Sequence, residues 1–339
     1  MALSGKNRSA AARSLMGVAV LVVLLFGALT VAWFYFAGEL ERRAEALVAE
    51  AGQAGTIIGC PGRDVFGYPF RLGVSCAQTS LERPSDGLQL SAGALRTAAQ
   101  LYDPGRIVAE LDGPLRVTSP DLPPLEMRWD LAQSSAALGE SGLDRLSLVL
   151  TAPSLSAGGE GAASTPLGSA TRAELHLRRN GADLDLALRD EALILTAPAI
   201  GDLPPFDFFA DIVIANGAGL LDEGLPPGGV AEALKGRSGT LRAVRLDLQG
   251  GGSADISGPF EVNAGGEITG QFAVGVENAQ AIVDLVARLV PDSVGIAGTI
   301  ANALQLAGRQ EGTRTVVDIS VDDGEARLGF IPLGQLPSL

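Results

Sequence analysis

The sequence predicts a mostly β protein, of the β-rich α+β class, carried on one N-terminal transmembrane helix. The chain has 339 residues, and aromatic residues are scarce at 5% while Gly (44) and Pro (19) are abundant. This composition suits short strands joined by tight turns better than a helical bundle. Apolar and polar residues also alternate through most of the chain after residue 56, as in half-buried strands. We therefore expect an elongated, curved antiparallel sheet of hairpins with a few covering helices.

Residues 16–37 form an uncharged, apolar run of 22 residues. At about 1.5 Å per residue this run spans roughly 33 Å, enough to cross a hydrocarbon core of roughly 30 Å. It ends in the aromatic residues 33–36, as transmembrane helices often do at a membrane interface. A cleavable signal peptide is the alternative, but its apolar region is usually about 7–15 residues long and ends in small residues. We expect an uncleaved transmembrane helix.

Positive charges precede this run at Lys6, Arg8 and Arg13. The positive-inside rule then predicts a cytoplasmic tail over residues 1–15 and a body on the opposite side of the membrane. Residues 38–55 repeat apolar side chains at helical spacing, which predicts a helical stalk; a short solvated linker is the alternative.

The two cysteines of the chain, Cys60 and Cys76, lie just after the stalk. On the non-cytoplasmic side of a membrane disulfides persist, so we expect these two residues to be bonded. Closing a loop of this length removes unfolded-state entropy equivalent to roughly 3 kcal/mol. A redox role is less favoured, because reactive pairs usually have CxxC spacing.

Between the cysteines lies a candidate structural or binding motif, Gly67, Tyr68, Pro69, Phe70 and Arg71. The glycine supplies an unusual backbone angle and the proline restricts its own. In one interpretation the Tyr-Pro-Phe edge plugs one end of the core while the arginine is solvated or paired. In the other, Tyr68 and Arg71 form a binding spot.

The rest of the β-rich domain, which covers residues 56–339, is predicted to form hairpins. Alternating apolar residues flank turn sequences at 112–114, at Asn180-Gly181 and at 322–324. Residues 154–168 are rich in Gly, Ala and Ser without an apolar period, so we expect a flexible loop there. The domain is either one unit or two lobes with a boundary near 155–170.

One amphipathic helix is predicted near the C-terminal end, over residues 278–290. Its apolar stripe consists of Ile282, Leu285, Val286 and Leu289. The stripe either covers one face or an open end of the sheet, or it acts as a lid helix that contacts lipid.

Composition and motifs exclude several function classes. The net charge of -14 argues against nucleic acid or anionic headgroups as the main partners. The single histidine, His176, falls on the polar face of a predicted strand, where we expect a solvated side chain. Asp322 and Asp323 are able to ligate a cation, but a turn uses such residues anyway. We find no nucleophile elbow, phosphate-binding loop or zinc motif, so we expect no cofactor, no metal and no enzyme activity.

Two motifs resemble the DUF2125 family of alphaproteobacterial proteins. The first is a membrane anchor followed by a cysteine, the sequence GYPFR at 67–71 and a second cysteine. The second is the ending DDGEARLGFIPLGQLPSL at 322–339, which is similar to the family's D-G-x-x-x-x-G-x-I-P-L-G-x-L-P. The resemblance implies a β-rich protein anchored in the bacterial inner membrane by residues 16–37, with a cytoplasmic N-terminus and a periplasmic body. It implies no established activity.

Leu and Ala dominate the predicted inward faces of the strands. Such a sheet either closes on a dry core or curves into a trough with an apolar lining. A trough resembles the architecture of AsmA-like and lipopolysaccharide-bridge proteins, which hold or pass lipids between membranes. Binding of lipid or another apolar ligand is therefore the leading hypothesis. The alternatives are an envelope scaffold that binds other envelope proteins and, less favoured, an envelope hydrolase.

Overall fold

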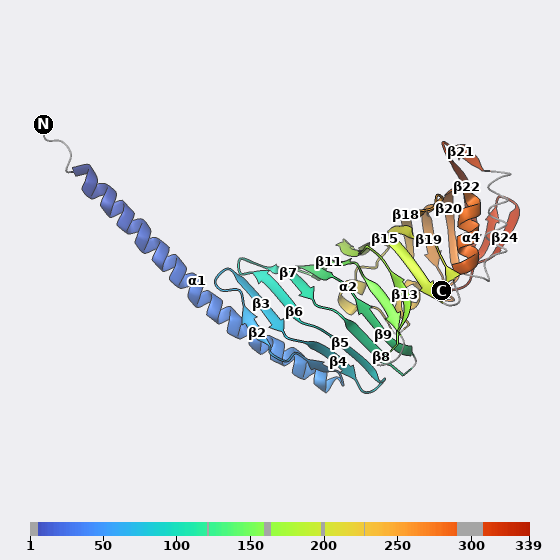
Figure 1. Ribbon diagram of the computed structural model, residues 1–339. Helices are drawn as coiled ribbons and strands as arrows, with labels where there is room; N and C mark the ends of the chain where they lie inside the picture. Colours follow the sequence, from blue (N-terminus) through green and yellow to red (C-terminus); the bar gives the residue numbers. More distant parts are fainter. Residues whose placement is uncertain (1–5, 121, 159–163, 198–200, 227, 290–307) are drawn as a thin grey trace.

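The computed structural model describes residues 6–120, 122–158, 164–197, 201–226, 228–289 and 308–339. Its main features are one long N-terminal helix, α1 (Lys6–Gln53), and one large, open antiparallel sheet (Figure 1). In Figure 1 the helix projects from one end of the sheet, and α4 (Ala279–Leu289) lies near the other end with the last strands. The predicted fold class is confirmed.

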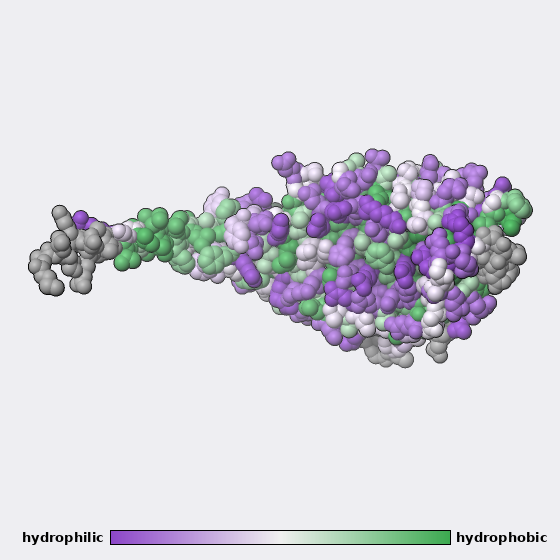
Figure 2. Space-filling model, turned by 90° about the horizontal axis from the view of Figure 1, so that it is seen from above, coloured by the Kyte–Doolittle hydropathy of each residue, from purple (hydrophilic) through white to green (hydrophobic). Residues whose placement is uncertain are grey.

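Helix α1 is continuous through both the apolar run and the segment expected to form a stalk. Its 48 residues give a length of about 70 Å. The apolar side chains of its first half are exposed, and Figure 2 shows a hydrophobic surface over the projecting part of the helix. Apolar surface of this extent is stable in a lipid environment, so the helix fits a single-pass membrane protein.

The first part of the sheet is a meander of long chain segments, most of which are broken once near the middle. Its strands are β1 (Ile57–Gly59), β2 (Asp64–Phe66), β3 (Arg71–Cys76), β4 (Thr79–Arg83), β5 (Leu88–Ala92), β6 (Leu95–Gln100), β7 (Asp103–Leu111), β8 (Leu115–Ser119), β9 (Leu122–Arg128), β10 (Leu131–Gly139), β11 (Gly142–Thr151), β12 (Ser154–Ala157), β13 (Thr165–Ser169), β14 (Arg172–Asn180) and β15 (Asp183–Ala197).

The breaks divide this meander into two half-sheets with the same order of segments. The first half-sheet runs β2-β3-β6-β7-β10-β11-β14-β15. The second runs β1-β4-β5-β8-β9-β12-β13-β15. Strand β15 belongs to both, since its two ends pair with different partners.

The breaks themselves lie side by side and form a line across the sheet, which we call the crease. Gly93 N donates to Asp112 O at 2.9 Å, and Ala152 N donates to Thr171 O at 2.9 Å, so neighbouring breaks are hydrogen-bonded to each other. Ala152 has a positive φ of 49°, as does Ala192 in the bulge of β15. Breaks and bulges of this kind bend a strand, and here they occur at the same level in successive segments.

The sheet continues without a gap to the C-terminal end. The elements of this part are β16 (Gly201–Asp202), β17 (Phe206–Ile214), α2 (Leu220–Glu223), α3 (Gly229–Leu234), β18 (Ser238–Leu248), β19 (Ser253–Val262), β20 (Ile268–Glu277), α4, β21 (Arg309–Glu311), β22 (Arg314–Asp322), β23 (Glu325–Leu328) and β24 (Ile331–Gln335). The order is β15-β17-β18-β19-β20-β22-β23-β24, with β21 also on β22.

A filled hydrophobic core lies at this C-terminal end. One cluster of buried side chains joins β20, β22, β23 and β24, and it includes Phe272, Val317 and Leu333. A second cluster joins β17 and β18 to α4 through Phe206, Leu248 and Leu285. The helix predicted over 278–290 is therefore present as α4 and covers part of the sheet.

Two details of the predicted hairpins are wrong. The segment 154–168 was expected to be a flexible loop, but its described residues contain β12 and β13, which pair with β9 and β15. Backbone hydrogen bonds to those neighbours compensate for the weak apolar pattern. The turn after β14 lies one position later than expected, at residues 181–182, because Asn180 pairs with Asp183. Strands β11 and β14, which lie before and after residues 155–170 in the chain, pair directly with each other, so the sheet is not interrupted between them.

Candidate functional site

One face of the first half-sheet is mostly apolar across its strands. Cross-strand neighbours in register form rows on this face, because paired residues point to the same side of a sheet. One row is Leu72, Ala99, Ile107, Ala136, Leu146, Leu177 and Leu186. A second row is Thr97, Ala109, Ser134, Leu148, Leu175 and Leu188. We call the side of the half-sheet that carries these rows the apolar face.

The apolar face continues toward the C-terminal core without a change of side. Leu186 pairs with Ile212, and Leu188 pairs with Ala210, which in turn pairs with Val244. The second half-sheet has an apolar row of its own, consisting of Ile58, Leu81, Leu90, Val117, Leu125 and Ala157. Both half-sheets therefore carry apolar rows on one face, as the alternating sequence pattern predicts.

The two ends of the apolar face differ in how well it is covered. At the C-terminal end the side chains form a core, with Val317 and Leu285 each only 3% exposed. In the first half-sheet, Ala132 and Cys76, in a neighbouring row, are buried, but the side chains of the two rows remain partly exposed. Neither of the two hydrophobic core clusters contains a residue of β1–β14. This end of the face therefore retains apolar surface that water contacts, which costs free energy unless another apolar group covers it.

The opposite face of the first half-sheet is polar. Its central row is Arg96, Glu110, Gln133, Val149, Glu174 and Arg189. A hollow of about 560 Å³ on this side has a mixed lining, which includes the charged residues Arg71, Arg96 and Glu110 and the apolar residues Phe66, Val108 and Val149. Arg96 also forms an ion pair with Asp112 at 2.6 Å. Mixed charges and hydroxyls make this face suitable for water, in contrast to the apolar face.

A serine, a histidine and a glutamate meet on the polar face, which the sequence did not indicate. His176 Nδ1 lies 3.0 Å from Ser147 Oγ, and His176 Nε2 lies 3.0 Å from Glu174 Oε2. The hydrogen bond from His176, together with Arg172, holds the pKa of Glu174 below its ordinary value. Ser147 lies in an interior strand paired on both sides, so its backbone N–H belongs to the ladder and is not free to stabilise an oxyanion. The cluster therefore lacks a central part of a serine hydrolase site.

The Gly67–Arg71 motif lies against α1, not in the core. Tyr68 OH is 2.9 Å from Thr30 Oγ1, and the Tyr68 ring contacts the rings of Phe26, Trp33 and Phe34. Trp33 Nε1 donates to Arg71 O at 2.7 Å. Gly67 has φ +109°, and a Cβ there would lie 2.7 Å from Arg71 O, so the glycine is required.

The expectation that this motif plugs one end of the core is wrong. Tyr68 is 46% exposed and Phe70 is 58% exposed, so neither side chain fills the interior of the sheet. The motif instead joins the β body to the helix. Only Arg71 reaches the hollow on the polar face, so Tyr68 and Arg71 do not form a common binding spot in this structure.

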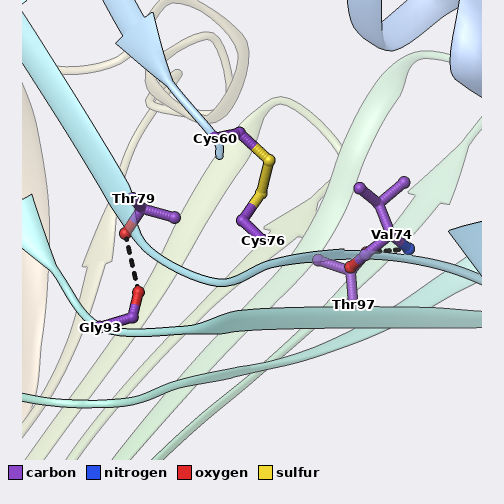
Figure 3. Close-up of a disulfide and its surroundings, with 6 residues drawn as sticks. All are labelled: Cys60, Val74, Cys76, Thr79, Gly93 and Thr97. Carbon is purple, nitrogen blue, oxygen red and sulfur yellow. Dashed lines mark hydrogen bonds between the residues drawn. A yellow bond between two sulfur atoms is a disulfide. The ribbon is translucent and has the colours of Figure 1, made fainter. Parts of the chain in front are cut away.

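The cysteines lie at the crease, where the structure places them at disulfide distance (Figure 3). Cys76 ends β3, and Cys60 follows β1, so the bond joins the first two segments of the meander. Ala77 N also donates to Pro61 O at 2.9 Å beside it. Nearby, Thr97 Oγ1 hydrogen-bonds to the backbone of Val74, which links β3 to β6. The cysteine pair thus holds the edge of both half-sheets at the start of the domain.

Two of the four residues of the candidate lid helix are placed. Leu285 is buried against Phe206 and Leu248, and Ile282 packs beside it. The side chains of Val286 and Leu289 lie outside the described residues. Helix α4 therefore covers the apolar face near β17 and β18, beyond the uncovered part in the first half-sheet.

The predicted hairpin turn at 322–324 is present between β22 and β23. Asp323 has φ 43°, and its Oδ1 accepts a hydrogen bond from Asn263 Nδ2 at 3.2 Å. In the described ranges no group of three or more His, Cys, Asp or Glu is arranged to hold a metal ion. The acidic residues here have a structural role in the turn.

Comparison with known proteins gives one family. A family model described as "Uncharacterized protein conserved in bacteria (DUF2125)" matches residues 33–337. The chain belongs to the DUF2125 family. No curated protein and no solved structure matches it. The matched region of the DUF2125 chain begins at Trp33, whose indole N–H donates a hydrogen bond to the Gly67–Arg71 motif. It also contains both cysteines and the apolar face.

One carboxylate of this DUF2125 protein lies on the apolar face. Asp190 pairs with Ala173 and Phe208, and burial raises its pKa above the ordinary value of 3.8. The folded state then binds a proton more tightly than the unfolded state, so stability falls as pH rises from about 3.8 through the folded pKa. We expect Asp190→Asn to remove this fall and to raise the free energy of unfolding at neutral pH, measured by denaturant unfolding between pH 4 and 7.

Asp185 lies on the same strand but on the polar face, and it provides a control because its pKa is shifted in the opposite direction. Burial alone would raise its pKa, but Arg178 and Arg242 outweigh that effect and the pKa is lowered. Its stabilising contribution is therefore present at neutral pH and is lost as pH falls through the folded pKa. Asp185→Asn should destabilise the protein at neutral pH. The same direction of change in both variants would contradict the assignment of Asp190 to the apolar face.

Proposed function

We propose that this DUF2125 protein is a non-enzymatic protein of the bacterial inner membrane that holds or passes lipid on the apolar face of its first half-sheet. Residues 16–37 anchor it once, and the positive residues before them support a cytoplasmic N-terminus and a periplasmic body. The observation that carries the proposal is the incomplete cover of the apolar face, next to a C-terminal core that is filled.

An acyl chain fits this face in chemistry and in length. The rows consist of Leu, Ile and Ala with few polar side chains, so they offer dispersion contacts and little hydrogen bonding. Seven strands at about 4.8 Å spacing give a row of roughly 29 Å. An acyl chain occupies about 15 Å, half of the roughly 30 Å hydrocarbon core of a bilayer. One row is therefore long enough to contact an entire acyl chain.

The position of α4 indicates from which end of the sheet a lipid reaches the apolar face. Around β17 and β18 the helix and the core clusters occupy the apolar face, whereas in the first half-sheet, on the α1 side, no core cluster occupies it. A lipid is therefore expected to enter from the membrane side and to stop before the filled core. This geometry favours holding a lipid near the membrane, or handing it to a partner along the sheet.

Photo-cross-linking in native membranes tests the proposal on the full chain. p-Benzoyl-phenylalanine is placed at Leu148, on the apolar face, or at the next residue, Val149, on the polar face. The two positions are adjacent in β11 (Gly142–Thr151), so they differ mainly in the face of the sheet on which the side chain lies. We expect mass spectrometry to find phospholipid adducts at position 148 and not at 149.

Other outcomes count against lipid binding. Equal labelling at the two positions would mean that lipid contacts the body without using the apolar face. A single stoichiometric protein adduct at position 148, without lipid, would support the envelope scaffold instead.

A further inference from the structure

The turn that carries Tyr68 lies beside the apolar part of α1, within the predicted membrane span. Its hydroxyl contacts Thr30, which precedes the end of the apolar run at Ala37 by seven residues, or about 10 Å. The ring also contacts Phe26, a further four residues toward the N-terminus. If residues 16–37 cross the bilayer, then Tyr68 lies below the membrane surface on the side of the body.

A second turn, between β6 and β7, accompanies the first. Leu101 N donates to Phe70 O at 2.9 Å, so the two turns are hydrogen-bonded neighbours. Tyr102 at the tip of this turn is 77% exposed, and Phe70 is 58% exposed. Large aromatic side chains exposed together cost free energy in water, but they are favoured at a membrane interface.

Several backbone groups of the first turn have hydrogen-bond partners, which matters in lipid because an unsatisfied polar group is costly there. Gly67 O accepts a hydrogen bond from Arg71 N, and Arg71 O accepts one from Trp33 Nε1. Phe70 O is satisfied by Leu101 N, and Pro69 has no N–H to satisfy. These bonds lower the cost of placing this turn in a lipid environment.

Charged residues define how deep the second turn lies. Asp103 follows Tyr102 directly and forms an ion pair with Arg106 at 3.3 Å. Because both side chains remain largely exposed, this pair belongs at the level of the lipid headgroups. Tyr102 then reaches the interface, and Tyr68 lies slightly deeper beside α1.

We propose that the turns at residues 67–70 and 101–102 insert into the body-side leaflet of the bilayer that α1 spans. The apolar face begins immediately behind them, since Leu72 and Ala99 pair with each other two or three residues away. On the proposed function, which this step assumes, an acyl chain moves from the leaflet onto the apolar face without crossing water. The membrane lipid itself is then the ligand.

Photo-cross-linking also tests the insertion, with the full chain in native membranes. p-Benzoyl-phenylalanine replaces Phe70 or Tyr102, and the control replaces Phe330, which is 94% exposed in the turn between β23 and β24. All three replacements are aromatic for aromatic at exposed sites, so folding is preserved. We expect phospholipid adducts at 70 and 102 and none at 330. Absence of lipid adducts at both 70 and 102 would overturn the insertion.

A charge variant tests whether the inserted turns supply lipid to the apolar face. Tyr102→Asp places a charge at the interface, and we expect it to lower the lipid adduct formed at position 148 by about fivefold. Phe330→Asp, the matched control, should leave that adduct unchanged. An equal loss of the adduct at position 148 in both variants would contradict the transfer of lipid from the turns to the apolar face.

Failure of this inference is distinguishable from failure of the proposed function. Lipid adducts at position 148 without adducts at 70 and 102 would leave lipid binding in place and remove the insertion. Adducts at 70 and 102 without any at 148 would support the insertion and contradict lipid binding on the apolar face.

Discussion

Loss of the Cys60–Cys76 disulfide is expected to lower the free energy of unfolding by roughly 3 kcal/mol. The bond closes a loop between residues 16 positions apart, and it holds the first two segments of the meander together at the crease. Cys60→Ser removes the bond while leaving the buried Cys76 side chain in place. The midpoint of thermal unfolding and the abundance of the protein in the cell should both fall.

The second cysteine provides the control for this prediction. If only the bond matters, Cys60→Ser, Cys76→Ser and the double variant should lose similar stability, with a small additional loss for Cys76 because it is 6% exposed. A Cys60→Ser protein that is stable and fully abundant, yet forms no lipid adduct at position 148, would instead assign the pair a direct role in function.

On the proposed function, Ala136→Trp is expected to remove most of the lipid that the apolar face holds. Ala136 lies in the centre of the first row, between Ile107 and Leu146, where its methyl group leaves room above the sheet. An indole at this point covers the neighbouring apolar side chains and blocks the path of an acyl chain along the row. The measurement is the phospholipid adduct at position 148, which should fall about tenfold if blocking costs roughly 1.4 kcal/mol of lipid binding.

Ser135→Trp is the matched control, since Ser135 is the neighbouring residue on the opposite, polar face. It adds the same volume to the same strand at an exposed position. The adduct at position 148 should persist in this variant. A loss of lipid in both variants would indicate damage to the sheet and would contradict a role for the apolar face itself.

Much of the fold is predictable because its signals are local. The apolar N-terminal helix follows from one uninterrupted apolar run, and the hairpin of β14 and β15 follows from Leu175 and Leu177 alternating with charges before a glycine turn. The cysteine pair follows from its position after that helix. In each case the informative residues are close together in the sequence.

The parts that were missed depend on distant residues. Tyr68 meets Thr30 across 38 positions, so its place beside α1 has no local signal. Ser147 and His176 meet across 29 positions, because the register of β11 and β14 sets them opposite each other. Strands β12 and β13 carry a weak pattern of their own, and they form because β9 and β15 provide hydrogen-bonding partners.

By itself the sequence determined the long apolar N-terminal helix, the β character of the body and the alternation that makes one face of each strand apolar. These properties depend on side-chain hydrophobicity and spacing along the chain. Only the tertiary structure decided which part of the apolar face is packed and which is left partly exposed. The residues of both parts follow the same alternating pattern, and the difference is whether α4 and the last strands, placed by long-range pairing, cover them.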